Sequence, residues 1–132
     1  MKIFIDANVL ISSFATDGIS RKLIDHLNDA RAIAVSEQVL SETRRLLLGK
    51  FKGNLQHVDA FLAAFKEIAE IVEPPFQTNF HVRDPDDVAI LAGAIKCGAT
   101  HLVTGDKDLL TVDTQGEILI LTPRALLDLL VR

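Results

Sequence analysis

The sequence contains a single cysteine, Cys97, and neither tryptophan nor tyrosine. One cysteine excludes an intramolecular disulfide and a zinc site built from several thiolates, so we expect a reducing, cytoplasmic location. No apolar run approaches the ~18 residues that cross a bilayer, and the N-terminal MKIFIDAN lacks the apolar stretch of a secretory signal. We therefore expect neither a membrane partner nor secretion.

Aromatic residues are scarce, at 5%, and all of them are phenylalanine. Hydrophobic residues make up 48% of the chain and charged residues 24%, which is typical of a globular protein rather than a disordered one. The core must therefore consist mainly of Leu, Ile, Val and Ala. With 132 residues, the chain has the length of one ordinary domain, and we expect a single domain over residues 1–132.

Positive charge is also in short supply, because 14 Lys and Arg stand against 18 Asp and Glu, a net charge of -4. Binding of nucleic acid by bulk charge is not expected. A nucleic-acid enzyme remains open, since it needs only a local basic strip beside an acidic metal site. The densest basic stretch is either a solvated helix face, or a phosphate rail for RNA or a docking patch for an acidic partner. It consists of Arg44, Arg45, Lys50 and Lys52.

Short apolar segments alternate with helical patterns along the whole chain. Strands are predicted at 2–5, 32–35, 101–104 and 118–121, and helices at 9–14, 19–30, 37–49, 55–69, 85–97 and 123–130. The polar stretch 77–83, which follows Pro74 and Pro75, is predicted to be a loop. This alternation predicts an α/β fold, a three-layer α/β/α sandwich with a mainly parallel central sheet.

Acidic residues fall where such sheets bind their ligands, outside the carboxyl ends of the strands. Asp6 follows the first predicted strand directly, and Asp106 follows the strand at 101–104. If these strands are neighbours, their carboxylates converge, and either one is protonated or a cation binds between them. Carboxylate oxygens prefer hard cations, so the expected metal is Mg²⁺ or Mn²⁺.

Each of these acids also has a plainer interpretation. Asp6 could shape a turn and cap the following helix, and Asp106 and Asp108 could be turn formers. Asp87 lies at the third position of a helix that Asp84 is suited to cap, so capping alone could explain it.

The other polar candidates are equally open. Glu42 shares a helix face with apolar residues, so its side chain either extends to solvent or points into a cleft as a ligand. Asn8 could be a helix cap, or it could orient Asp6. Thr104 could be an ordinary β-branched strand residue.

Taken together, these segments resemble the PIN domain. The resemblance rests on a hydrophobic strand followed by DANV at 6–9, Glu42 in a mid-chain helix, DPDD at 84–87 before an Ala/Leu-rich helix, and VTGDKDLL at 103–110. DPDD and VTGDKDLL in this order, about twenty residues apart, are fairly specific, whereas DANV alone is weak. Over essentially its whole length, the chain is most similar to the branch of toxins of toxin–antitoxin systems related to VapC.

The resemblance implies a three-layer α/β/α fold and a metal-dependent ribonuclease. It also implies an RNA substrate, an antitoxin partner and a homodimer. Its acidic quartet, both catalytic and metal-binding, corresponds to Asp6, Glu42, Asp87 and Asp106, with Asp108 as a further acid and Asn8 and Thr104 as supporting groups. One departure is Val88, where close relatives carry another acid, and its absence would weaken a second metal site.

Two other functions share part of this sequence pattern. A phosphatase of the haloacid-dehalogenase type also begins with a strand and an aspartate, but it needs a second aspartate where Asn8 stands. A degenerate domain that only binds RNA or protein is the other, although such a scaffold gains nothing from crowded acids. No Ser–His or Cys–His nucleophile pair stands out, so covalent catalysis is not expected.

Overall fold

The computed structural model describes residues 1–73 and 82–131. Five strands form one parallel sheet in the order β3-β2-β1-β4-β5. The strands are β1 (Ile3–Ile5), β2 (Ile33–Ser36), β3 (Glu70–Val72), β4 (His101–Val103) and β5 (Leu119–Leu121). The helices are α1 (Ala7–Ala15), α2 (Ile19–Asp29), α3 (Glu37–Leu48), α4 (Leu55–Ile68), α5 (Pro85–Lys96), α6 (Lys107–Leu110) and α7 (Pro123–Leu130).

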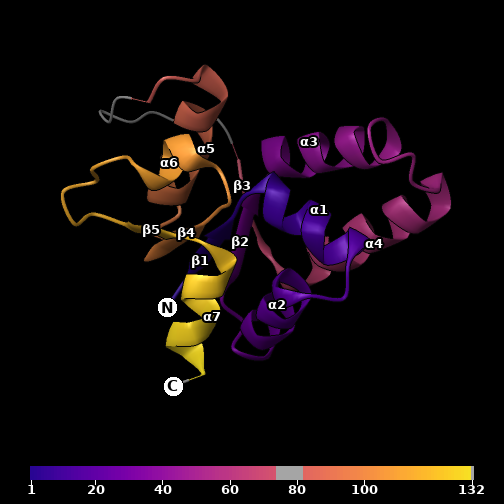
Figure 1. Ribbon diagram of the computed structural model, residues 1–132, viewed down its shortest axis with the longest axis horizontal. Helices are drawn as coiled ribbons and strands as arrows, with labels where there is room; N and C mark the ends of the chain where they lie inside the picture. The colour runs from indigo at the N-terminus through magenta and orange to yellow at the C-terminus, as the bar shows by residue number, and fades with distance from the viewer. Residues whose placement is uncertain (74–81, 132) are drawn as a thin grey trace.

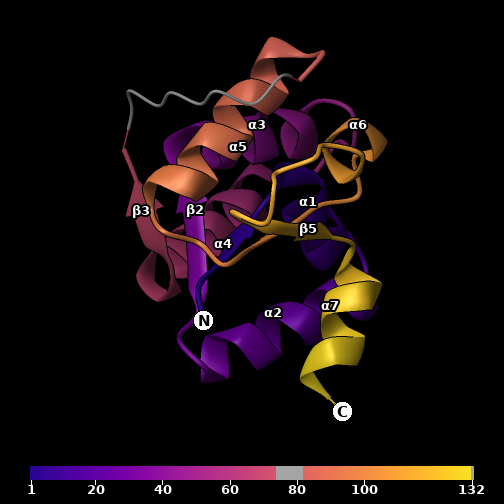
Figure 2. The same cartoon turned by 90° about the vertical axis from the view of Figure 1, so that its left-hand side faces the viewer.

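Helices cover both faces of the sheet (Figure 1). The connections β1–β2 and β2–β3 run in the same direction across the sheet, so right-handed crossovers place α1 to α4 together on one face. The connections to β4 and β5 run the opposite way, and α5 and α6 lie on the other face, which is turned toward the viewer in Figure 2. Helix α7 packs against α2. The predicted three-layer α/β/α sandwich is confirmed.

The core is mainly aliphatic, as expected, and surrounds the central strand β1. All three residues of β1 are fully buried, as are Leu102 and Val103 of neighbouring β4. Strands covered on both faces need apolar residues at every position, which explains why they read as continuous apolar runs. In the described parts of the chain, no helix has the length and apolar character needed to span a membrane.

Capped helix starts determine how α3 and α5 leave the sheet. The hydroxyl of Ser36 accepts a hydrogen bond from the Val39 N–H at 3.2 Å and so begins α3. The Asp84 carboxylate accepts one from the Asp86 N–H at 2.9 Å, and Pro85 takes the first position of α5, where its missing N–H costs nothing. The predicted start of α5 is thereby confirmed.

Two elements differ from the prediction. Residues 70–72, for which no strand is predicted from the sequence, form the edge strand β3, which pairs with β2 in the register Ala34↔Glu70. Residues 105–108 are predicted to form a sharp turn, but residues 107–110 form the single helical turn α6. Of the predicted loop 77–83, only Val82 and Arg83 lie within the described residues.

Because β1 is buried, shortening a large side chain at its centre should lower the free energy of unfolding strongly. Phe4→Ala should lower the free energy of unfolding by about 3–5 kcal/mol, because Phe4 is fully buried and its removal leaves a cavity. Leu119→Ala on the edge strand β5, where the side chain is 52% exposed, should cost less than about 1 kcal/mol. Urea denaturation measures both, and equal losses would contradict the assignment of β1 as the centre of the core.

Candidate metal centre and active site

The order of the sheet strands reverses between β1 and β4. From β1 the chain continues to β2 on one side of the sheet, whereas from β4 it continues to β5 on the opposite side. The two strands pair directly, with Ile5 opposite Val103, and the Asp6 N–H donates to the Val103 carbonyl at 3.1 Å. Asp6 and Asp106 therefore leave neighbouring strands at the edge where doubly wound sheets bind ligands.

A cleft of about 170 Å³ lies at this point, and it brings the predicted acidic quartet together. Asp6 follows β1, Asp106 follows β4, Asp87 lies in the first turn of α5, and Glu42 projects from α3. Glu42 is half-buried, so its side chain borders this cleft and is not fully extended into solvent. Asp84 and Asp86 add two exposed acids to the lining.

Asp6 is the most constrained of these acids, with only 5% of the residue exposed. Its Oδ1 accepts a hydrogen bond from the Ala7 N–H at 2.7 Å, which caps α1. Its Oδ2 accepts one from the Thr104 hydroxyl at 2.8 Å and one from the Asn8 amide at 3.2 Å. Asp6 is thus both a helix cap and a wall of the cleft, and Asn8 and Thr104 orient it.

Asp106 is tied to the same network. Its N–H donates to Thr104 Oγ1 at 3.0 Å, and its Oδ1 accepts from the Asp108 N–H at 2.8 Å, which caps α6. Asn8 Oδ1 accepts from the Gly105 N–H at 2.8 Å. The fully buried Thr104 therefore links the two strand-end aspartates, a role beyond that of an ordinary strand residue.

The carboxylates that lie close enough together to share a metal ion differ in membership from the predicted quartet. Among the described residues, one carboxylate oxygen each from Asp87, Asp106 and Asp108 lie within 4.8 Å of one another. Asp6 borders the same cleft outside that group. Asp108 also forms an ion pair with Arg83 at 2.8 Å and lines an adjacent hollow.

Burial and mutual repulsion shift the acids toward their protonated forms. The pKa of Asp87 is raised to about 7, first by burial and then by the neighbouring charge of Asp106. Burial also raises the pKa of Asp6, although the hydrogen bond from Thr104 opposes this shift. The pKa of Glu42 is raised by burial and by the charge of Asp6. These carboxylates cannot all ionise without repelling one another, and a bound divalent cation would relieve that repulsion.

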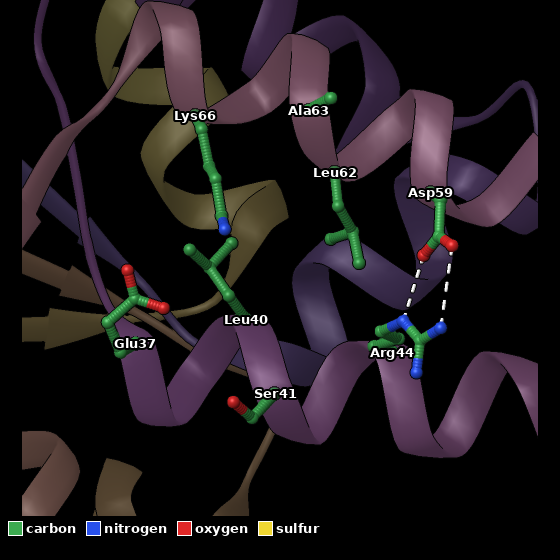
Figure 3. Close-up of a pocket in the computed structure, with 8 residues that line it drawn as sticks. All are labelled: Glu37, Leu40, Ser41, Arg44, Asp59, Leu62, Ala63 and Lys66. Carbon is green, nitrogen blue, oxygen red and sulfur yellow. Dashed lines mark hydrogen bonds and ion pairs between the residues drawn. The ribbon is translucent and has the colours of Figure 1, made fainter.

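The predicted basic residues lie in different surroundings. Arg44 pairs with Asp59 of α4, with Nε 2.8 Å from Oδ1, and both line a groove between α3 and α4 that Figure 3 shows. Arg45 lies one helical turn after Glu42, and its charge partly opposes the upward shift in the pKa of Glu42. Lys50 and Lys52 are exposed in the loop that follows α3.

Val88, where the resemblance leads one to expect an acid, packs against the hydrophobic core and does not line the cleft. The geometry therefore contains no substitute for that acid at this position.

A model of the PIN domain family matches residues 2–108, so the chain belongs to the PIN domain family. Among solved structures, it is similar to VapBC2 from Rickettsia felis bound to a DNA fragment from their promoter, with 19% identity, a TM-score of 0.68 and coverage of 92% of this chain and 98% of that one. PAE2754 from Pyrobaculum aerophilum gives 22% identity, a TM-score of 0.57 and coverage of 99% and 90%. Both similarities concern the fold. A comparison with curated proteins finds no match.

The raised pKa of Asp87 predicts a pH-dependent stability in metal-free protein. The pKa of Asp87 is about 7 in the folded state and 3.8 in the unfolded state. Between these two values the folded protein binds a proton that the unfolded protein has lost. The contribution of Asp87 to the free energy of unfolding therefore becomes less favourable as pH rises from about 4 to 7. Asp87→Asn should therefore become more stable than the parent, by at least about 1 kcal/mol above pH 7. The advantage should vanish near pH 4.

Denaturant unfolding in EDTA across this pH range measures the effect. Asp25→Asn, an exposed change on α2, is the matched control and should leave the pH profile of the parent unaltered. A constant difference between Asp87→Asn and the parent at every pH would show that Asp87 carries no strain from neighbouring charge.

Proposed function

We propose that this PIN domain is a metal-dependent ribonuclease that hydrolyses RNA phosphodiester bonds. The observation that carries the proposal is the convergence of Asp6, Asp87 and Asp106, from separate elements, in one cleft at the reversal of strand order. All of their donor atoms are carboxylate oxygens, which suit Mg²⁺ or Mn²⁺.

Asp6, Asp87 and Asp106 would hold the ion, with Glu42 and Asp108 completing its surroundings directly or through water. When bound, the ion supplies a water of lowered pKa and stabilisation of the charge that develops on the phosphate.

The chain's own residues prepare the cleft for this chemistry. Thr104 and Asn8 fix the carboxylate of Asp6 through hydrogen bonds of 2.8 and 3.2 Å, so little reorganisation accompanies ligand binding. Asp87 carries a proton for part of the time at neutral pH, and this proton leaves when the carboxylate becomes a ligand. The positive N-terminal ends of α1 and α5 face the cleft and partly offset its negative charge.

The rival functions are less well supported. Asn8 stands where a haloacid-dehalogenase phosphatase needs its second aspartate, and its amide is already used to orient Asp6. Membership of the PIN domain family favours the nuclease. A degenerate binding domain would not retain buried carboxylates whose pKa values are raised by burial and repulsion.

We also propose that the protein acts in the cytoplasm as the toxin of a toxin–antitoxin pair, with an antitoxin partner and as a homodimer. Support comes from the resemblance to VapC-related toxins and from the similarity of fold to VapBC2. Co-expression with the product of a neighbouring reading frame, followed by co-purification, tests the partnership.

Cleavage of RNA should require the metal and both strand-end aspartates. Asp6→Asn and Asp106→Asn preserve size but remove a ligand charge, so cleavage should fall by about two orders of magnitude or more. Labelled RNA is incubated with each variant in Mg²⁺, Mn²⁺ or EDTA. Asp113→Asn, an exposed change outside the cleft, is the matched control. Cleavage that persists in EDTA or in both variants would refute the mechanism.

The arginines of α3 should differ in their effect on RNA binding. Arg45 lies on the helix face of Glu42, whereas the guanidinium of Arg44 is engaged by Asp59. Arg45→Ala should therefore weaken RNA binding and flatten its dependence on salt more than Arg44→Ala does. Affinities measured over a salt series compare the two. Identical behaviour of both variants and the parent would assign this basic stretch to a solvated helix face.

A further inference from the structure

A second hollow opens beside the acidic cleft, between the C-terminal half of α1 and the end of α3. Its volume of about 440 Å³ lies within the ~300–1,000 Å³ range of small-molecule sites. Asn8, Ile11 and Leu46 line this hollow and the acidic cleft alike, so the two adjoin. We call it the Phe51 groove, after the aromatic residue that forms its outer wall.

The lining of the Phe51 groove combines an aromatic ring, an apolar floor and a cation. Phe51 is 49% exposed, although it is one of few aromatic residues in the chain. The ammonium of Lys50 lies 5.8 Å from the centre of its ring. Ile11 and Leu46 form apolar surface, and Ser12 adds a hydroxyl. The acidic cleft beside it, by contrast, is lined mainly by carboxylates.

We propose that the Phe51 groove binds a nucleobase of single-stranded RNA, from a nucleotide that neighbours the phosphodiester at the acids. Stacking on an aromatic ring accepts any base, because every base has a π face. The ammonium of Lys50 complements the phosphate that follows the stacked base. The proposal rests on the proposed ribonuclease function and names the part of its substrate that lies outside the acidic cleft.

A nucleic acid fits this groove better than an apolar protein segment does. An apolar protein segment would use the apolar floor, but it would offer no anionic partner to the ammonium of Lys50. In a nucleotide, apolar base and anionic phosphate occur together. Because the groove adjoins the cleft, one strand could place a base against Phe51 while its neighbouring phosphate meets the acids.

Binding of a short labelled single-stranded RNA in Mg²⁺, followed by fluorescence anisotropy, tests the proposal. Asp6→Asn serves as the background that prevents cleavage. Adding Phe51→Ala should weaken binding about tenfold, and Phe51→Leu should weaken it nearly as much, because leucine keeps apolar bulk but has no π face. Leu55→Ala, which removes an apolar side chain that is 53% exposed outside the groove, should leave binding unchanged.

A second experiment removes a base from the RNA instead of the aromatic ring of Phe51 from the protein. An RNA with one abasic position, moved along the strand, should lose affinity at one site in the Asp6→Asn protein and lose none there once Phe51→Ala is added. Thermal melts check that each variant folds, and Phe51→Leu decides the outcome if the alanine variant does not. Three results would overturn the proposal. They are RNA binding by Phe51→Leu as tight as with Phe51, which would fit an apolar protein docking site, an abasic penalty that persists with Phe51→Ala, and no RNA binding at all.

Cleavage by the otherwise unchanged protein is measured in parallel. Metal-dependent cleavage with Phe51-independent binding would contradict this inference alone. Phe51-dependent binding without metal-dependent cleavage would contradict the nuclease mechanism alone and support the groove.

Discussion

Carboxylates of like charge share one small volume at the end of the β1–β4 pair, and the fold has to hold them there. Direct pairing of the two strands places Asp6 and Asp106 at one edge, and the first turn of α5 adds Asp87. Burial and, after it, the neighbouring charge of Asp106 raise the pKa of Asp87. A divalent cation bound among these carboxylates, as we propose, would relieve the repulsion.

Helix capping explains how the acids are kept in place. Asp6 caps α1 and Asp106 caps α6, so each carboxylate stabilises a helix N-terminus while another part of it faces the cleft. Capping and metal binding were alternative interpretations of these residues, and the geometry is compatible with both at once. Thr104 couples the two caps through one buried hydroxyl. The same turns that begin two helices therefore build the candidate metal centre.

The sequence was sufficient for the layers, for most elements and for the convergence of Asp6 and Asp106, because alternating apolar strands and helices leave few topologies open. It missed β3, whose three residues show no period and become a strand only by pairing with β2. It also could not show that Arg44 is engaged by Asp59, since that contact joins two helices. The carboxylate grouping of Asp108 with Asp87 depends on tertiary placement that no motif contains.

The two adjoining hollows are suited to different parts of an RNA substrate. The acidic cleft is chemically suited to a cation and a phosphate, and the Phe51 groove to a base, while Asn8 borders both. The central claim is that the cleft holds a divalent cation. A crystal of the protein soaked in Mn²⁺ and measured for anomalous scattering tests it most directly. The account predicts a peak in contact with carboxylate oxygens of Asp6, Asp87 and Asp106, and a fully occupied cation elsewhere with none in the cleft would contradict it.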